Sequence, residues 1–342
     1  MKAVIKASEA SGSLQVADMP VPGTGAGEVL VRIKGASICY SDVSILNNRY
    51  IGRHPVPLPL IMGHEGAGMI EALAPDVKGY AVGDRVALEP IAGCGYCDLC
   101  KSGFKNMCPN WKHIGITCNG TFAEYISVNA AQLHKLPDKI SFAEAALVEP
   151  LGLVVRSLEQ SRPMLGETVA IIGPGSLGMM HLLAYKASGA SKVIVIGLEK
   201  DYERLKLAER LGADTINIDN QNPLEAIKEI TGRSGVDIAV ETANSPKAAE
   251  MCFNITAPRG RIVLFGLYPE ATFSPVKMLR NGITVYGDVG AVSRQFLRAI
   301  DWLKHGKIDL SDMITNRFSL DEAAQAFEAT KKGGTIKVVF EV

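Results

Sequence analysis

Residues 168–201, TVAIIGPGSLGMMHLLAYKASGASKVIVIGLEKD, constrain the fold of this chain more than any other stretch. An apolar run from Val169 to Ile172, rich in β-branched residues, leads into a glycine-rich turn and then into a helical pattern. A second apolar run follows from Val193 to Ile196. The order strand, turn, helix, strand is that of a crossover between parallel strands.

The glycine-rich turn has the spacing G-x-G-x-x-G, which in this setting predicts a dinucleotide site. The first glycine suits a tight turn, the second a close approach of the pyrophosphate, and the third the packing of helix on strand. The helix N-terminus would then hold the phosphates. The predicted coenzyme turn comprises Gly173, Gly175, Ser176, Leu177 and Gly178.

The alternation of strand and helix continues beyond this unit. Strand-like segments occur at Thr215–Ile218, Val236–Glu241, Arg261–Leu264 and Ile283–Tyr286, with helical patterns between most of them. This order predicts an α/β fold with a doubly wound parallel sheet.

The chain before about residue 150 differs in composition. It is rich in Gly and Pro and holds short strand-like runs such as EVLVRIKG and GDRVALEP, which predict an antiparallel, loop-rich β domain. Two amphipathic helical stretches and a closing strand, TIKVVFEV, follow residue 290. We therefore expect two domains, which is also what a length of 342 residues favours.

Charge and hydrophobicity narrow the classes of partner. The 36 basic and 36 acidic residues balance, and no basic tract indicates nucleic acid or an anionic membrane. The N-terminus has no apolar core of signal-peptide length, and no apolar run is long enough to span a membrane. These features predict a cytoplasmic protein whose partners are small molecules.

Four of the seven cysteines lie in residues 94–108, CGYCDLCKSGFKNMC. Thiols stay reduced in the cytoplasm, so a cluster there indicates metal ligands rather than disulfides. The spacing C-x2-C-x2-C-x7-C allows four thiolates to close a tetrahedral structural zinc site, with an iron–sulfur cluster as the rival. The predicted ligands are Cys94, Cys97, Cys100 and Cys108.

A second set of metal-ligand types lies upstream. Cys39 falls in GASICYSDVSIL, and His64 with Glu65 falls in LIMGHEGAGMI. The histidine and glutamate are surrounded by glycines that allow close backbone approach or positive φ, namely Gly63, Gly66 and Gly68. Glu149 stands in the apolar stretch AALVEPLGLVV, where a buried carboxylate needs a cation or a proton.

These motifs resemble those of the zinc-containing medium-chain dehydrogenases/reductases, the family of alcohol, sorbitol and threonine dehydrogenases. ICYSD is similar to the catalytic-cysteine motif, GHEGAG to the His–Glu motif, and CGYCDLCKSGFKNMC to the structural zinc lobe. VEPLG is similar to the third-ligand region of the polyol branch and GPGSLG to the coenzyme loop. The five motifs stand in the family's order and extend over essentially the whole chain.

The resemblance implies a GroES-like catalytic domain formed by residues 1–150 and 291–342, with the structural zinc lobe at about residues 90–110. Residues 151–290 would form a Rossmann domain that binds the coenzyme. It also implies two zinc ions per subunit and a homo-oligomer, either a dimer or a tetramer, held together through edge strands of the coenzyme domain.

Residue roles follow from the same resemblance. Cys39 and His64 would hold a catalytic zinc together with Glu65 or Glu149, and the motifs leave open which glutamate binds at rest. Ser41 would relay the substrate proton, and the family's relay histidine is replaced here by Ser44. Asp42 would orient the zinc-bound histidine from the second coordination sphere.

The implied reaction is hydride transfer between an alcohol and NAD, giving a ketone or aldehyde, with NADP as the alternative coenzyme. The acid expected at the end of the second strand is replaced by Gly197, so Glu199 is the candidate partner of the ribose. Lys200 and Arg204 would instead suit a 2′-phosphate.

The paired glutamates favour a polyol or other secondary alcohol as substrate. A threonine dehydrogenase would use the same machinery, and a non-catalytic coenzyme-binding protein or a zinc-ribbon interaction module is the alternative of another class. The candidate pocket residues are Tyr50, Trp111 and His113.

Overall fold

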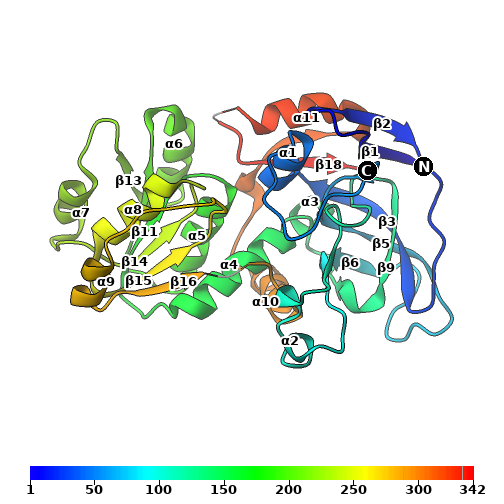
Figure 1. Ribbon diagram of the computed structural model, residues 1–342, viewed down its shortest axis with the longest axis horizontal. Helices are drawn as coiled ribbons and strands as arrows, with labels where there is room; N and C mark the ends of the chain where they lie inside the picture. The colour runs from blue at the N-terminus through cyan, green and yellow to red at the C-terminus, as the bar shows by residue number, and fades with distance from the viewer. Residues whose placement is uncertain (288, 333) are drawn as a thin grey trace. The chain divides into compact units, whose positions relative to one another are not determined.

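The structure is a computed structural model that describes residues 1–287, 289–332 and 334–342. The chain forms two compact units (Figure 1). The first consists of Met1–Leu153 and Gly290–Val342, and the second of Val154–Val289. The chain therefore leaves the first unit, builds the second, and returns.

The second unit contains a parallel six-stranded sheet in the order β13-β12-β11-β14-β15-β16 among the described residues. The strands are β11 (Thr168–Ile172), β12 (Lys192–Gly197), β13 (Asp214–Asn217), β14 (Val236–Glu241), β15 (Thr256–Leu264) and β16 (Thr284–Gly287). Every pairing in it is parallel, which confirms the predicted doubly wound α/β fold.

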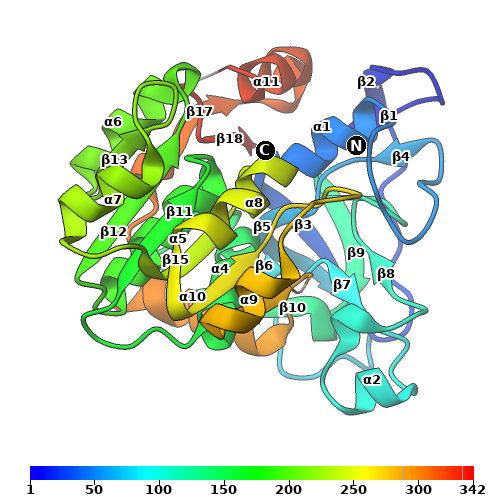
Figure 2. The same cartoon turned by 60° about the vertical axis from the view of Figure 1, so that its left-hand side comes forward.

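Helices cover both faces of this sheet (Figure 2). They are α5 (Ser176–Ala187), α6 (Tyr202–Arg210), α7 (Pro223–Thr231), α8 (Pro246–Ile255) and α9 (Pro275–Asn281), with the 3-10 turn η3 (Glu199–Asp201) before α6. Alternate strand residues such as Ala170 and Ile172 pack with α7 and α8 in one cluster. The residues between them point to the other face, because side chains alternate along a strand, and α5 packs against β11 and β12 there.

The first unit is mainly β, and most of its strand pairs are antiparallel. A seven-stranded sheet has the order β10-β6-β5-β3-β18-β17, with β9 also paired to β3, beside a three-stranded sheet β2-β1-β4 and the pair β7-β8. The strands are β1 (Lys2–Lys6), β2 (Leu14–Asp18), β3 (Glu28–Ser37), β4 (Leu60–Ile61), β5 (Glu65–Leu73), β6 (Arg85–Leu88), β7 (Ile91–Ala92), β8 (Lys112–His113), β9 (Tyr125–Asn129), β10 (Leu133–Lys135), β17 (Ile314–Phe318) and β18 (Lys337–Glu341).

Short helices and 3-10 turns connect these strands. The helices are α1 (Tyr40–Leu46), α2 (Asp98–Lys101), α3 (Phe142–Ala145), α10 (Ser293–Lys304) and α11 (Ala323–Thr330), and α4 (Val148–Ser161) begins in the first unit and ends in the second. The 3-10 turns are η1 (Lys105–Met107), η2 (Ala130–Gln132), η4 (Ser311–Met313) and η5 (Leu320–Glu322).

Strand β17 was absent from the sequence prediction, which placed only one strand after residue 290. β17 is a sheet edge that pairs in parallel with β18. Its sequence, ITNRF, is nowhere fully buried, and Asn316 and Arg317 dilute the apolar signal. A half-exposed edge strand gives little hydrophobic pattern to detect.

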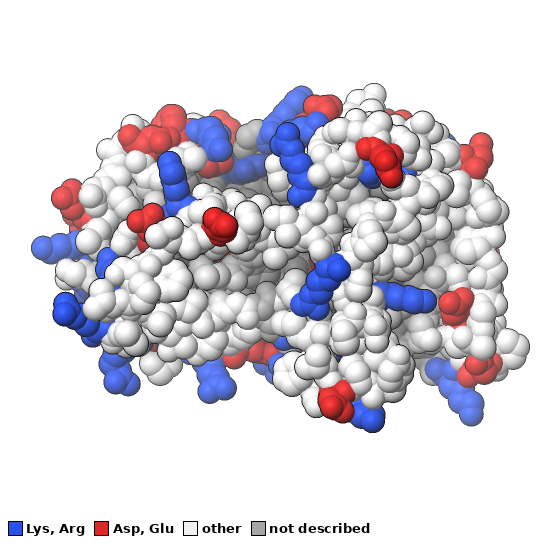
Figure 3. Space-filling model, viewed as in Figure 1, with Lys and Arg blue, Asp and Glu red and all other residues white. Residues whose placement is uncertain are grey.

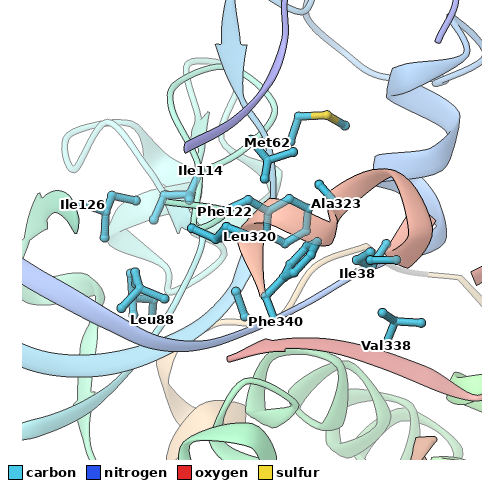
Figure 4. Close-up of a cluster of buried hydrophobic side chains, with 14 of the residues drawn as sticks. Ile38, Met62, Leu88, Ile114, Phe122, Ile126, Leu320, Ala323, Val338 and Phe340 are labelled. Atoms are coloured by element: carbon cyan, nitrogen blue, oxygen red, sulfur yellow. The ribbon is translucent and has the colours of Figure 1, made fainter. Parts of the chain in front are cut away.

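The core of the first unit joins the beginning of the chain to its end (Figure 4). The ring of Phe122 lies 5.0 Å from that of Phe340 in β18 and 6.2 Å from that of Phe327 in α11, both edge-on. The cluster around them also contains Ile38 and Met62, which flank the residues of the predicted metal site in sequence. Core packing therefore fixes the chain on either side of that site.

None of the helices in the described part of the chain is long and apolar enough to cross a membrane. On the face drawn in Figure 3, basic and acidic side chains are interspersed rather than gathered by sign.

Candidate functional site

Cys39, His64 and Glu65 converge although they are spread over the sequence. One ligand atom from each lies within 4.8 Å of the others. The convergence follows from the pairing of β3 with β5, in which Ser37 stands opposite Glu65. Because the pair is antiparallel, the end of β3 meets the beginning of β5, and Cys39 lies beside the histidine.

Glycine permits the turn that presents His64. Gly63 has φ of +88°, and a Cβ at this residue would lie 2.3 Å from the ring of Phe122. A side chain would therefore be strained by the backbone and would also displace a core aromatic ring. The close backbone approach predicted from the glycines around the His–Glu pair is present here.

Asp42 lies on the Nδ1 side of His64 and orients its ring. Its carboxylate is fully buried and accepts the Cys39 N–H at 2.9 Å, and its other oxygen lies 3.3 Å from His64 Nδ1. Burial opposes protonation of His64, but Asp42 outweighs it and raises the histidine pKa well above its ordinary value. Nδ1 thus faces the Asp42 carboxylate at ion-pair distance without forming a hydrogen bond, and Nε2 faces the hydroxyl of Ser41 at 3.5 Å.

Glu65 is held by a lysine that the sequence analysis missed. Lys337 of β18 donates to Glu65 Oε1 at 2.6 Å and also contacts Oε2, which accepts a hydrogen bond from Ser37. Burial lowers the pKa of Lys337, but Glu65 raises it by more, so the net direction is upward and the ammonium stays charged. The available signal was a lysine inside the apolar closing strand TIKVVFEV.

Glu149 lies in the first turn of α4 and is buried, but it stands outside the group of ligand atoms within 4.8 Å of one another. Burial is the main reason that its pKa rises to about 7, and the charges of His64 and Glu65 also act on it. Glu149 therefore belongs to the surroundings of the cluster, and Glu65 is the nearer carboxylate.

The donor set fits zinc. Thiolate, imidazole and carboxylate are the three ligand types that zinc takes in proteins, and three protein ligands leave a position for a substrate. Asp42 against His64 Nδ1 is the carboxylate–histidine arrangement that fixes a metal-binding imidazole. Cys39 is partly exposed, so the cluster is accessible from one side.

The four cysteines of residues 94–108 also come together, with one ligand atom from each within 4.8 Å of the others. Zinc–sulfur bonds of about 2.3 Å in a tetrahedron separate sulfur atoms by about 3.8 Å. The Sγ atoms of Cys97 and Cys108 are 3.8 Å apart, and those of Cys94 and Cys100 are 4.0 Å apart. All four are free thiols, and their spacing fits a closed all-sulfur zinc site.

The glycine-rich turn has the backbone that a coenzyme loop requires. Gly173 follows β11 with φ of +108°, and a Cβ on Gly178 would lie 2.0 Å from the Gly173 carbonyl oxygen. A Cβ on Gly175 would meet nothing within 4 Å, so space is open in front of it. Helix α5 begins at Ser176, and its first turn, with Leu177, presents backbone N–H groups.

The residues predicted to choose the coenzyme form a polar group after β12. The Glu199 carboxylate accepts hydrogen bonds from the side chains of Asn217 and Asn220. Arg204 pairs with Asp201 at 3.5 Å, and burial lowers its pKa. Lys200 is exposed to solvent.

The predicted pocket residues lie near the metal cluster of the first unit. The His113 ring is 5.4 Å from the His64 ring, and the Trp111 ring is 5.1 Å from that of His113. His113 Nδ1 donates to the Ile114 carbonyl at 2.7 Å, and burial lowers the histidine pKa to about 3. Tyr50 is close enough to His64 for their charges to interact, and burial raises the pKa of its phenol.

Comparison with known proteins supports the same interpretation. Residues 25–138 match the model of the alcohol dehydrogenase GroES-like domain, and residues 176–305 match that of the zinc-binding dehydrogenases. A sorbitol dehydrogenase of Bacillus subtilis (strain 168) is 35% identical over 320 residues, which cover 92% of this chain and 90% of that protein. An L-threonine 3-dehydrogenase of Pyrococcus abyssi is 36% identical over 346 residues, 99% of this chain and 98% of that one.

A solved structure matches over the whole chain. It is described as a short chain alcohol dehydrogenase of Escherichia coli CFT073 complexed with NADH, and it has a TM-score of 0.91 and 28% identity. The match covers 100% of this chain and 99% of that one. The family resemblance read from the five motifs is confirmed by these matches.

The coenzyme turn can be tested without a substrate. Gly178→Ala should weaken NADH binding by at least about tenfold, because the added methyl must displace the Gly173 carbonyl in a tightly packed turn. The measurement is quenching of coenzyme fluorescence on titration, with zinc content as a check on folding. Gly23→Ala is the matched control, since a Cβ there meets nothing within 4 Å. Equal affinities of Gly178→Ala and wild type would contradict the assignment.

Proposed function

Because the chain belongs to the zinc-binding alcohol dehydrogenase family, we propose that it transfers a hydride between a polyol or other secondary alcohol and NAD, giving a ketone or aldehyde. The observation that carries the proposal is the convergence of Cys39, His64 and Glu65, with Asp42 behind the histidine and Ser41 in front of it. The glycine-rich turn of the second unit supplies the coenzyme site.

Two zinc ions per subunit belong to this proposal. Cys39, His64 and Glu65 would hold the first, with Glu149 able to join them, and the four cysteines of residues 94–108 would hold the second. Zinc at the first site supplies a Lewis acid that lowers the pKa of a substrate hydroxyl. A cytoplasmic, reducing compartment suits a chain whose seven cysteines are all free.

Ser41 is the group that moves the substrate proton. Its hydroxyl stands at the Nε2 side of His64, so it can accept a proton from a hydroxyl held at the cluster and donate its own outward. Ser44 does not extend this path, because its hydroxyl donates to the Tyr40 carbonyl at 3.1 Å. The exit therefore runs through water or through the coenzyme ribose.

Lys337 sets the charge of the site. Cys39 and Glu65 bring two negative charges to the cluster as ligands, and Asp42 brings a third behind His64. The Lys337 ammonium offsets one of them at hydrogen-bond distance. A less negative surrounding favours the developing negative charge on the substrate oxygen, since preorganised cationic groups stabilise such charge.

The pocket residues support a polyol as substrate. Trp111 is only 9% exposed, and its indole N–H is buried and has no hydrogen-bond acceptor in the described part of the chain. Leaving a buried donor unpaired costs about 1–3 kcal/mol. A substrate hydroxyl distant from the reacting carbon would satisfy it once the side chains that cover the indole nitrogen move aside, and neutral His113 offers a second polar edge beside it.

Glu199 favours NAD. Its carboxylate is placed after β12 by Asn217 and Asn220, and a carboxylate there would accept hydrogen bonds from ribose hydroxyls and repel a 2′-phosphate. Arg204, the arginine that would suit NADP, is already paired with Asp201.

A second copy of the chain is the partner we propose at the β16 edge. β16 pairs only with β15 among the described strands, so its outer edge offers unpaired backbone groups. Large apolar side chains stand exposed on the neighbouring α9, with Leu279 73% and Val276 52% exposed. An open strand edge beside an apolar helix suits a symmetric dimer, with a tetramer as the next assembly.

Metal content and turnover together test the proposed reaction. Purified protein should hold two zinc ions per subunit. Mild chelation should remove one of them and should also abolish the reduction of NAD by polyols. Ser41→Ala should keep both zinc ions and lose turnover by about 100-fold, whereas Ser44→Ala should resemble wild type. The assay would use polyols, secondary alcohols and L-threonine, each with NAD and NADP.

Each result of this assay has a meaning. Faster turnover of threonine than of any polyol would support the threonine dehydrogenase alternative. One zinc and no turnover with any substrate would leave a coenzyme-binding protein without catalysis. In the same assay Glu199→Ala should lower the ratio of kcat/KM for NAD to kcat/KM for NADP. An unchanged ratio would exclude Glu199 from coenzyme choice.

A substrate and enzyme double-mutant cycle tests the role of Trp111. Removing one distal hydroxyl from a polyol should lower kcat/KM of the wild type by roughly 10- to 100-fold, as should Trp111→Phe on the intact polyol. The two losses should not add, because both remove the same hydrogen bond. Trp302→Phe is the control at the other tryptophan, and additive losses in the Trp111→Phe cycle would contradict the assignment.

Leu279→Lys tests the dimer. A charge placed on the exposed face of α9 should shift the dimer towards monomer by at least about tenfold in dissociation constant. Light scattering after size-exclusion chromatography measures the mass. Val82→Lys, at an exposed apolar residue of the first unit, should leave the mass unchanged. A Leu279→Lys protein with the wild-type mass would place the interface elsewhere.

A further inference from the structure

Glu89, directly after β6, carries a carboxylate that no part of the proposed reaction uses. Its side chain is 0% exposed and lies between three donors. Lys105 Nζ is 2.6 Å from Oε1, while His134 Nε2 at 2.9 Å and Ser293 Oγ at 2.8 Å donate to Oε2. A buried carboxylate is tolerated only with such partners.

The three donors come from distant parts of the chain. His134 lies on β10, Ser293 begins α10, and Lys105 begins η1, the turn that leads to the zinc ligand Cys108. Lys105 also donates to Ser293 at 3.1 Å. Glu89 therefore joins residues 94–108, which we call the four-cysteine lobe, to a strand and a helix of the first unit.

Apolar packing contributes little to the attachment of the four-cysteine lobe. Helix α2 inside the lobe has no buried residue, and the lobe exposes Tyr96 by 68% and Phe104 by 45%. A segment that buries so little apolar surface cannot rely on hydrophobic packing for its position. A buried ion pair with fixed geometry can supply that position, since removing one partner leaves a buried charge unpaired.

The η1 turn also contacts the loop that carries Tyr50. Arg53 donates to the Asn106 carbonyl at 3.1 Å and reaches the Met107 sulfur at 3.3 Å. Tyr50, three residues before Arg53, interacts electrostatically with Cys39 and His64. The turn fixed by Glu89 is thus the one on which the loop beside the metal cluster rests.

We propose that Glu89 is a positioning residue that anchors the four-cysteine lobe through Lys105 and, by way of the η1 turn and Arg53, sets the position of the loop 50–53. The anchoring rests only on the contacts around Glu89. The effect on substrate binding rests on the proposed function, because it assumes that Tyr50 borders the substrate.

The test compares two ion pairs whose carboxylates stand at opposite ends of β6, with Glu89 directly after the strand and Asp84 directly before it. Glu89→Gln and Lys105→Met each break the buried pair, and Lys135→Met breaks the exposed pair with Asp84, which spans 2.8 Å. The first readout is the alkylation rate of Cys94, Cys97, Cys100 and Cys108, mapped by mass spectrometry on the zinc-loaded protein. The second is hydrogen–deuterium exchange of residues 47–59.

Both buried-pair variants should raise the alkylation rate by at least about tenfold and speed exchange in residues 47–59, while Lys135→Met matches wild type. In the double variant Glu89→Gln/Lys105→Met the alkylation rate should rise by less than the two single effects combined, because neither charge of the pair is left unpaired. Arg53→Met should speed exchange without changing alkylation. With an active substrate, Glu89→Gln should raise KM several-fold and leave kcat within about twofold.

Wild-type alkylation rates in both single variants would contradict the proposal that Glu89 and Lys105 anchor the four-cysteine lobe. Faster alkylation with unchanged exchange in residues 47–59 would keep the anchor and overturn its effect on the loop. If the wild type turned over no substrate, the proposed function would fail, and the alkylation and exchange results would still decide the anchor and the loop position.

Discussion

The buried ion pair between Glu65 and Lys337 is the interaction on which the candidate site of the first unit depends. Lys337 lies on the last strand, β18, and Glu65 begins β5, directly after His64, the proposed zinc ligand. Two buried charges are tolerated only when they meet. The charge that balances Glu65 therefore comes from the segment that follows the second unit in the chain, so the cluster of Cys39, His64 and Glu65 is complete only with the closing strand in place.

The sequence predicted most of the features that are local in the chain. The four cysteines of residues 94–108 and the glycine turn each lie in one loop, so their spacing in sequence predicts their geometry. One ligand atom of each cysteine lies within 4.8 Å of the others, and Gly173 has the positive φ that such a turn needs. Five strands of the second unit were predicted to within one residue at each end, and β15 begins five residues earlier than predicted. The central strands β11 and β12 are the most readily predicted, because buried parallel strands are continuous apolar runs. The convergence of Cys39 with His64 was predicted through the family resemblance rather than from spacing.

The features that escaped prediction depend on contacts between distant segments. Lys337 acquires its role only through β18 lying beside β3, and no local pattern marks its partner. The motif treated Glu149 and Glu65 as equal candidates, but the fold places Glu65 nearer to Cys39 and His64. Local spacing cannot distinguish them, since the difference lies in where α4 begins relative to β5.

The two proposed metal-binding groups place different demands on the fold, and this difference explains their surroundings. The cluster of Cys39, His64 and Glu65 draws its geometry from paired strands and from a core that includes Phe122, so the fold itself places these three residues together. The four-cysteine lobe has a short helix and almost no core, so a metal must organise its interior. A metal can close a loop on itself but cannot place that loop on a neighbouring surface. Placement requires a buried contact with fixed geometry. The ion pair of Glu89 with Lys105 provides one where apolar packing is lacking.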